Sequence, residues 1–300
     1  MPELPDIQIY IESLGLRIFG KELIDIKIIN PFLLRSVDPP LAEYNGKQII
    51  GIERIGKRIV LCFKQDLFLV VHLMIAGRLR WMEVKPKPSR KIALGLFTFE
   101  SGFLLFTEAG TKRRASLHAV RGREALAFFD RGGIDPVSSD EHNFRAALTQ
   151  ENHTLKRTLT DQRFFSGIGN SYSDEILHAA GLSPFKQSQR LTDDEIHRLH
   201  RSCIDVLEIW TKRLRKETGN GFPEKVTAFR EEMAVHGKYG EPCPVCGTAV
   251  QRIRYAENES NYCPKCQTAG KLLADRGLSR LLKDDWPSTV EELEALQSSH

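Results

Sequence analysis

Four of the six cysteines form two closely spaced pairs towards the end of the chain. In Cys243-Pro-Val-Cys246 and Cys263-Pro-Lys-Cys266 two residues separate the cysteines, and sixteen residues lie between the pairs. Two such knuckles on a β-hairpin supply four thiolates to one tetrahedral metal, which leaves no open position for catalysis. We therefore predict one structural zinc ion (Zn2+). The alternatives are disulfides, which the lack of a secretion signal disfavours, and a redox pair, which two C-x-x-C units disfavour.

The N-terminal sequence Met-Pro-Glu is a second candidate for chemistry. Methionine before proline is usually removed, which leaves Pro2 with a free secondary amine. A terminal amine titrates near ~8, so part of it is neutral at pH 7. Such an amine can attack an aldehyde-level carbon and form an iminium, and Glu3 beside it is placed to exchange protons. The residues alone leave open that Pro2 is an ordinary N-terminal proline.

Two kinds of element must position these groups. Residues 1–17 have helical spacing of apolar residues, and six segments between Leu23 and Leu117 are rich in β-branched and aromatic residues. Strands without intervening helices indicate an antiparallel sandwich or barrel. Beyond a Gly-, Pro- and Ser-rich linker the pattern becomes helical, and a Thr192–Glu195 capping box begins a helix of about twenty residues. We expect domains at 1–130, 141–236 and 237–271, with a linker at 131–140 and an acidic extension at 272–300.

Composition narrows the class of protein. The 300 residues suggest two domains, and 41% hydrophobic with 27% charged residues exclude wholesale disorder. No apolar run approaches the ~18 residues of a membrane helix, so we expect a cytoplasmic protein with no membrane contact. The net charge is +4, with +6 in residues 1–130 and −1 in each of residues 131–236 and 237–300. The excess positive charge is a weak indication of a polyanionic partner.

Five sequence blocks occur together in one order: MPELPD, RIGKRIVL, HLMIAGRLR, TDQRFFSGIGNSYSDEIL and HGKYGEPCPVCG with YCPKCQ. Together they resemble the formamidopyrimidine-DNA glycosylase/endonuclease VIII family of base-excision repair, as a divergent member of bacterial type. The resemblance runs from residue 2 to about residue 267. It implies an α+β multidomain fold with an N-terminal antiparallel β-sandwich and a C-terminal helix–two-turn–helix domain that carries a zinc-ribbon β-hairpin. It also implies a nucleoid-associated monomer that binds damaged double-stranded DNA.

The resemblance assigns roles to particular residues. Pro2 is the nucleophile at C1′, Glu3 is the acid that helps to open the sugar ring, and Lys57 grips a phosphate beside the lesion. Asn258 takes the catalytic position of the family's hairpin arginine, five residues before the third cysteine. The positions that it implies for DNA contact are His72, Met74, Ile75, Arg113, Lys156, Gly169, Asn170 and Arg254.

The chain departs from the family pattern at four positions, which are Asp6, Ile75, Ala115 and Asn258. Asn258 replaces an arginine, so a neutral amide stands where a guanidinium would clamp phosphate bidentately. Ile75 replaces a methionine and Ala115 a phenylalanine among the residues that fill the void left by a flipped base; Leu117 is a partial substitute for the phenylalanine. Asp6 replaces a glutamate. These changes bear on lesion choice, rate and strand cleavage.

The resemblance thus implies a bifunctional glycosylase and abasic-site lyase that excises oxidised bases through a Pro2 Schiff base. A damaged-DNA or abasic-site binding protein with weak or lost glycosylase activity is the alternative that Asn258, Ala115 and Ile75 motivate. A zinc-ribbon protein of RNA or transcription leaves the N-terminal proline unexplained. The sequence does not specify the preferred base, the choice between β- and β,δ-elimination, or the role of residues 272–300.

Overall fold

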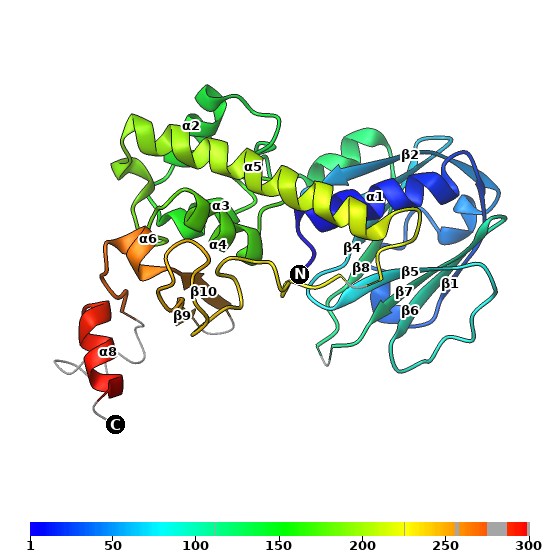
Figure 1. The fold of residues 1–300 in the computed structure, drawn as a ribbon. Helices are drawn as coiled ribbons and strands as arrows, with labels where there is room; N and C mark the ends of the chain where they lie inside the picture. Colours follow the sequence, from blue (N-terminus) through cyan, green and yellow to red (C-terminus); the bar gives the residue numbers. More distant parts are fainter. Residues whose placement is uncertain (111, 225, 256–257, 275–286, 299–300) are drawn as a thin grey trace. The chain divides into compact units, whose positions relative to one another are not determined.

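The computed structural model describes residues 1–110, 112–224, 226–255, 258–274 and 287–298 (Figure 1). They divide into two compact units. The first comprises Met1–Gly132 and Glu208–Ala228, and the second comprises Gly133–Leu207 and Phe229–His300. The unit boundary therefore falls inside one long helix, α5 (Asp193–Thr218), whereas we expected residues 141–236 to form one domain.

The first unit contains helix α1 (Leu4–Ile18), the last part of α5 and an antiparallel sheet. Its strands are β1 (Glu22–Ile28), β2 (Lys47–Ile55), β3 (Arg58–Phe63), β4 (Leu67–His72), β5 (Gly77–Met82), β6 (Ala93–Phe99), β7 (Gly102–Glu108) and β8 (Ser116–Arg121). Neighbouring strands are hydrogen-bonded in the order β5-β7-β6-β1-β2-β3-β4-β8. Three short 3-10 helices, η1 (Pro31–Leu33), η2 (Leu41–Tyr44) and η3 (Arg123–Phe129), lie in the connections.

The sheet consists of two four-stranded halves, β5-β7-β6-β1 and β2-β3-β4-β8, that pack around one core. Strands β1 and β2 pair at two positions only, Glu22 with Gln48 and Leu23 with Lys47, so the halves are joined by a narrow seam. Buried side chains of both halves, such as Phe106 and Phe63, share a cluster with Tyr10 of α1. This arrangement confirms the N-terminal antiparallel β-sandwich, and Figure 1 shows α1 lying along the strands.

Two of the eight strands were not among the segments predicted from sequence. Strand β5 alternates buried Gly77 and Leu79 with the more exposed Arg78 and Arg80, so its apolar content is low. In strand β8, the more accessible Ser116 and His118 alternate with the buried Leu117 and Ala119, and the strand ends at the exposed Arg121. A half-buried strand needs only one apolar face, which makes such short segments weak in a hydrophobic profile.

The second unit is mainly helical and includes the cysteine-bearing hairpin. Its helices are α2 (Glu141–Thr149), α3 (Leu155–Thr160), α4 (Asn170–Ala179), the first part of α5, η4 (Ser188–Arg190), α6 (Pro264–Thr268) and α8 (Val290–Ser298). The hairpin pairs β9 (Gln251–Tyr255) with β10 (Asn258–Tyr262). At the start of α5 the Thr192 and Glu195 side chains accept from each other's backbone N–H, which confirms the capping box.

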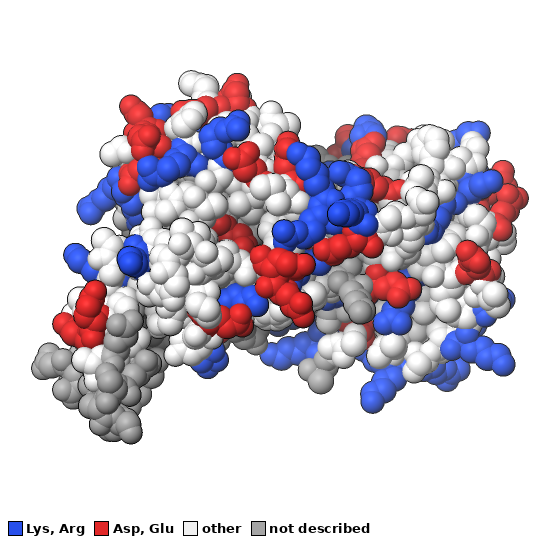
Figure 2. Space-filling model, viewed as in Figure 1, with Lys and Arg blue, Asp and Glu red and all other residues white. Residues whose placement is uncertain are grey.

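The surface carries both signs of charge. Figure 2 shows Lys and Arg side chains interspersed with Asp and Glu on the face in view. In the part of the chain that the structure describes, no helix combines the length and apolar character needed to cross a bilayer.

Candidate active site and metal centre

The N-terminus is held by the first turn of α1. Glu3 is the N-cap residue, Pro5 lies in the first turn, and the Asp6 carboxylate accepts a hydrogen bond of 3.0 Å from the Glu3 backbone N–H. Pro2, Glu3 and Asp6 are all buried. A carboxylate three residues after the cap is well placed to bind the cap N–H, so the shorter side chain of Asp6 still fixes the Glu3 backbone.

The terminal amine of the unprocessed chain belongs to Met1 and lies in a charged, largely buried setting. Burial is the main cause that lowers the pKa of this amine below its ordinary value; Glu3 and Asp6 oppose the shift, and Arg78 and Lys57 add to it. Removal of Met1 would transfer the amine to the buried Pro2, one residue along. A lower pKa enlarges the neutral, nucleophilic fraction at pH 7.

Lys57 lies in the turn between β2 and β3 and is buried to 6% exposure. Gly56, just before it, has a φ of +58°, a left-handed conformation that glycine adopts readily. The next residue, Arg58, pairs directly with His72 across β3 and β4. Burial, then Arg58, Lys57 and His118, lower the pKa of His72 to about 4. His72 is therefore neutral at pH 7 beside two cations.

The turn between β4 and β5 carries Met74 and Ile75. Its backbone closes through a 2.9 Å hydrogen bond from Gly77 N–H to the Leu73 carbonyl, and Met74 takes a φ of +53°. The Arg78 guanidinium donates hydrogen bonds to the Ile75 and Gly77 carbonyls at 3.1 and 2.6 Å, and these bonds stabilise the turn. The Ile75 side chain is 58% exposed and so is presented to the surroundings.

The segment before β8 carries Arg113 and Ala115. The buried Glu108 carboxylate accepts from the backbone N–H groups of Arg114 and Ala115 at 3.0 and 3.3 Å. Arg113 is exposed, and its guanidinium reaches the Lys91 carbonyl at 2.5 Å. Ala115 is buried, and Leu117 is fully buried in the sandwich core. The expectation that Leu117 partly substitutes for a phenylalanine is therefore wrong, because its side chain faces the core.

In the second unit, the Gln162 side chain closes the turn that leads into α4. Its carbonyl accepts from Gly167 N–H at 2.8 Å, and its amide donates to the Ile168 carbonyl at 2.8 Å. Gly167 has a φ of +91°, and Gly169 is the N-cap of α4. The helix starts at Asn170, so its first backbone N–H groups and the positive end of its dipole lie at this turn, where an anion is favoured.

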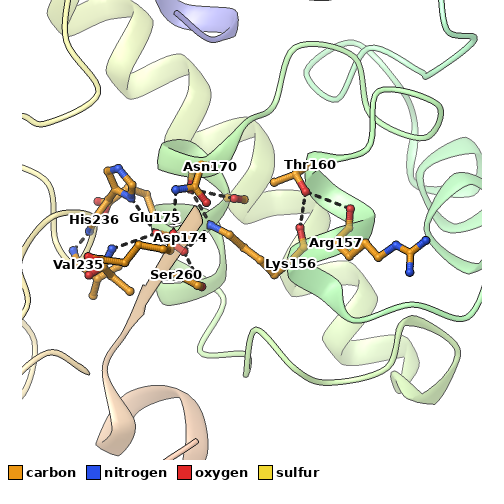
Figure 3. Close-up of polar contacts among 12 residues, drawn as sticks. Lys156, Arg157, Thr160, Asn170, Asp174, Glu175, Val235, His236 and Ser260 are labelled. Carbon is orange, nitrogen blue, oxygen red and sulfur yellow. Dashed lines mark hydrogen bonds and ion pairs between the residues drawn. The ribbon is translucent and has the colours of Figure 1, made fainter. Parts of the chain in front are cut away.

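A buried carboxylate joins this turn to the hairpin (Figure 3). Asp174 is wholly buried, and its oxygens contact Lys156 Nζ at 2.5 Å, His236 Nδ1 at 2.8 Å and Ser260 Oγ at 2.9 Å. Lys156 Nζ also donates to the Asn170 carbonyl at 2.7 Å. Burial alone would raise the pKa of Asp174, but Lys156 and His236 bring it below its ordinary value.

Glu175, the next residue, holds a separate segment. Its carboxylate accepts three backbone N–H bonds of 2.7–2.9 Å from Ala234, Val235 and His236. Burial raises the pKa of Glu175 despite these donors. The segment before the first cysteine pair is thus fixed to α4 by its backbone.

The four predicted zinc ligands lie together. Their sulfur atoms are all within 4.8 Å of one another, and Cys246 and Cys263 are 3.4 Å apart. A tetrahedral zinc with bonds of about 2.3 Å requires sulfur–sulfur distances of roughly 3.8 Å. A cysteine cluster of this size, packed against Val235 and Val250, fits one structural zinc ion.

The hairpin places its charged residues side by side. The Arg254 guanidinium lies 3.4 Å from the Glu259 carboxylate, opposite it in the register, and Arg252 lies 3.6 Å from the same carboxylate. The Asn170 side-chain amide donates to the Glu259 carbonyl at 2.8 Å. The side chain of Asn258 lies outside the described part of the structure.

The structure thus assembles two groups of predicted site residues. Pro2, Glu3 and Lys57 surround the terminus in the first unit, and Lys156, Gly169 and Asn170 meet in the second. Sequence reasoning missed residues that hold these groups: Asp174, Glu175, Arg78 and His178. Asp174 and His178 follow Asn170 at intervals of four, so helical spacing alone places them on its face of α4.

Known protein families and relatives match the chain along most of its length. Residues 1–115 match the formamidopyrimidine-DNA glycosylase N-terminal domain, 133–217 the formamidopyrimidine-DNA glycosylase H2TH domain, and 240–269 a zinc finger found in FPG and IleRS. The formamidopyrimidine-DNA glycosylase of Lactococcus lactis subsp. cremoris is 30% identical over 89% of this chain and 99% of that protein. That of Thermus thermophilus is 32% identical over 90% and 100%.

A solved structure agrees with these matches. The complex between the Lactococcus lactis Fpg and an abasic site containing DNA superposes with a TM-score of 0.77 and 28% identity, over 89% of this chain and 99% of that one. The sandwich, the helical unit and the cysteine hairpin are therefore shared with it in one order. The chain belongs to the formamidopyrimidine-DNA glycosylase/endonuclease VIII family of DNA repair glycosylases.

Proposed function

We propose that this protein is a base-excision DNA glycosylase that also cleaves abasic sites, with the Pro2 amine as its nucleophile. One observation carries the proposal: Pro2 and the Glu3 carboxylate are buried, and burial lowers the pKa of the amine of Met1, the residue directly before Pro2. A terminal amine in solution is mostly protonated at pH 7, and the same burial is expected to shift the Pro2 amine towards the neutral, reactive form once Met1 is removed.

The reaction follows from the groups at the terminus. The Pro2 nitrogen attacks C1′, the electrons of the glycosidic bond leave with the base, and an iminium forms between Pro2 and C1′. Glu3 supplies a proton as the sugar ring opens. Loss of a C2′ proton then expels the 3′-phosphate and breaks the strand. The damaged base must first leave the stack, at an expense of a few kcal/mol.

The second unit supports phosphate binding. Asn170 begins α4, Gly169 caps it, and the Lys156 ammonium lies at the same helix end. Backbone N–H groups and a cation at a helix N-terminus suit one DNA phosphate. We therefore propose damaged double-stranded DNA as the partner of a monomer that acts in the cytoplasm, and the DNA in the Lactococcus lactis structure supports this partner.

Borohydride trapping on a duplex with one abasic site tests the nucleophile. The wild-type chain, with removal of Met1 verified by mass spectrometry, is expected to form a covalent complex. A variant with a non-cleavable N-terminal extension is expected to form none, and the same extension at the C-terminus is the matched control. Equal trapping by both extended proteins, with Pro2→Gly behaving like the wild type, would exclude Pro2.

A DNA-damage binding protein is the second candidate, and the burial of Ala115 favours it. The phenylalanine of the family pattern is absent there, and the buried Leu117 does not replace it. A panel of duplexes with 8-oxoguanine, formamidopyrimidine, oxidised pyrimidines and a bare abasic site separates the two. Base release from any oxidised duplex supports the glycosylase, whereas tight abasic-site binding without release supports the binding protein.

A further inference from the structure

One polar stripe of α4 faces the cysteine hairpin at three successive turns. Asn170, Asp174 and His178 follow one another at intervals of four, which places them on one face of the helix. Asn170 donates to the Glu259 carbonyl and Asp174 accepts from Ser260 Oγ. His178 completes the stripe, with its Nε2 3.3 Å from the Cys243 sulfur.

The Cys243 sulfur defines the direction of this last contact. A thiolate bound to zinc carries no proton, so it only accepts hydrogen bonds. His178 Nε2 must therefore carry the hydrogen and donate it to the sulfur. Both groups are buried, since His178 is 8% exposed and Cys243 2% exposed.

We propose that His178 is a positioning residue of the zinc site, whose Nε2–H hydrogen bond to the Cys243 thiolate strengthens zinc binding and fixes the first knuckle to α4. An N–H donor withdraws charge from a thiolate, and four thiolates on one divalent ion leave an excess of negative charge. The Cys243 knuckle lies 65 residues from His178 in sequence, so this bond also ties the hairpin to the helix that begins at Asn170.

Three substitutions in the full-length, zinc-loaded chain test the proposal. His178→Phe keeps a ring of similar size and removes the donor, whereas His178→Gln keeps an N–H at a similar reach. His200→Phe is the matched control, because His200 is equally buried in the same unit, packs on Phe144 and bonds the Ser139 carbonyl instead of a cysteine. Zinc affinity is measured by competition with a chromogenic chelator.

Loss of a hydrogen-bond partner behind a metal ligand lowers metal affinity about 10- to 100-fold. We expect this loss for His178→Phe, affinity within a few-fold of wild type for His178→Gln, and wild-type affinity for His200→Phe. In the cobalt-substituted protein, the sulfur-to-metal charge-transfer band should move to lower energy in His178→Phe alone, because an undonated thiolate is more easily oxidised. General loss of packing would not move this band.

Equal affinity and an unmoved band in His178→Phe, or an equal loss in His200→Phe, would overturn the proposal. A second experiment uses the unmutated chain and so tests the proposal even if a variant fails to fold. In cadmium-113-substituted protein, scalar coupling between the metal and the His178 Nε2 proton is expected through the N–H···S bond, and absence of that coupling with the metal bound would equally overturn it.

Discussion

Asp174→Asn is the substitution that most directly tests how the second unit holds Lys156 and Asn170, the groups that we propose for phosphate binding. The change keeps the shape of the side chain and removes its charge. The Lys156 ammonium, whose side chain is 14% exposed, then has no carboxylate 2.5 Å away, and one amide N–H is placed among the donors His236 and Ser260. An uncompensated buried cation and a donor facing donors both destabilise the folded state.

The magnitude follows from the burial of the pair. Removal of one partner from a buried ion pair costs about 3–5 kcal/mol. Lys156 keeps its 2.7 Å bond to the Asn170 carbonyl and some access to water, so the lower end applies. We expect a loss of about 3 kcal/mol, which lowers Tm by roughly 6–12 °C for a unit of this size.

A double-mutant cycle with Lys156→Met, followed by calorimetry, measures the pairwise part. We expect a coupling of roughly 2 kcal/mol, because the second substitution removes the cation that the first left unpaired. Glu208 and Lys212, an exposed pair at 2.8 Å on α5, serve as the control cycle with a coupling of about 0.3–0.5 kcal/mol. A coupling for Asp174 no larger than that of the control would refute the reasoning.

The pH dependence of this effect has a definite sign. Because the pKa of Asp174 lies below its ordinary value in the folded protein, its ionised form stabilises the fold at every pH above the unfolded value of about 3.9. The stability difference between wild type and Asp174→Asn should therefore persist from pH 5 to 8. It should narrow as the pH falls below that value and the folded-state carboxylate takes up its proton.

Three further outcomes are expected. Arg78→Gln removes a cation that lowers the pKa of the Met1 amine, and we expect it to act in the same way on the Pro2 amine after Met1 is removed. The pH midpoint of the borohydride trapping rate should therefore move upwards, and an unmoved midpoint would contradict this. Gly77→Ala should lower Tm, because its Cβ would lie 2.2 Å from the Leu73 carbonyl oxygen, whereas Gly15→Ala in α1, with open space around it, should stabilise by about 0.5–1 kcal/mol. Removal of zinc with a chelator should lower the calorimetric transition of the second unit and leave that of the first unchanged.

The zinc ligands were predictable because their information is local. A spacing of two residues within each pair nearly determines the geometry of a knuckle, and all four sulfurs indeed lie within 4.8 Å of one another. The start of α5 was predictable for the same reason, since Thr192 and Glu195 cap one turn. Its end was not: α5 runs for 26 residues to Thr218, beyond the apolar stripe that indicated about twenty.

The supports of the site were not predictable, because their partners are distant in sequence. Asp174 contacts His236 and Ser260, which are 62 and 86 residues away. A lone acidic residue on a helix is most often solvated, and only the tertiary fold shows that this one is buried among three donors. The role of Asp6 was likewise not predictable. Its side chain is one methylene shorter than the glutamate of the family pattern, yet its carboxylate accepts a hydrogen bond from the Glu3 backbone N–H.

At the positions where the family resemblance implies residues that fill the void left by a flipped base, this chain carries other residue types than the family pattern. Ala115 contributes a backbone N–H to Glu108 and no exposed side chain, and the buried Leu117 stabilises the core. Of the three wedge positions, Ile75 and Arg113 alone present exposed side chains. The phenylalanine of the family pattern carries an aromatic ring that can stack on a base, and neither Ala115 nor Ile75 carries such a ring. The distinction between an efficient glycosylase and a binder of abasic DNA therefore depends on whether Ile75 and Arg113 suffice to keep the damaged nucleotide out of the stack.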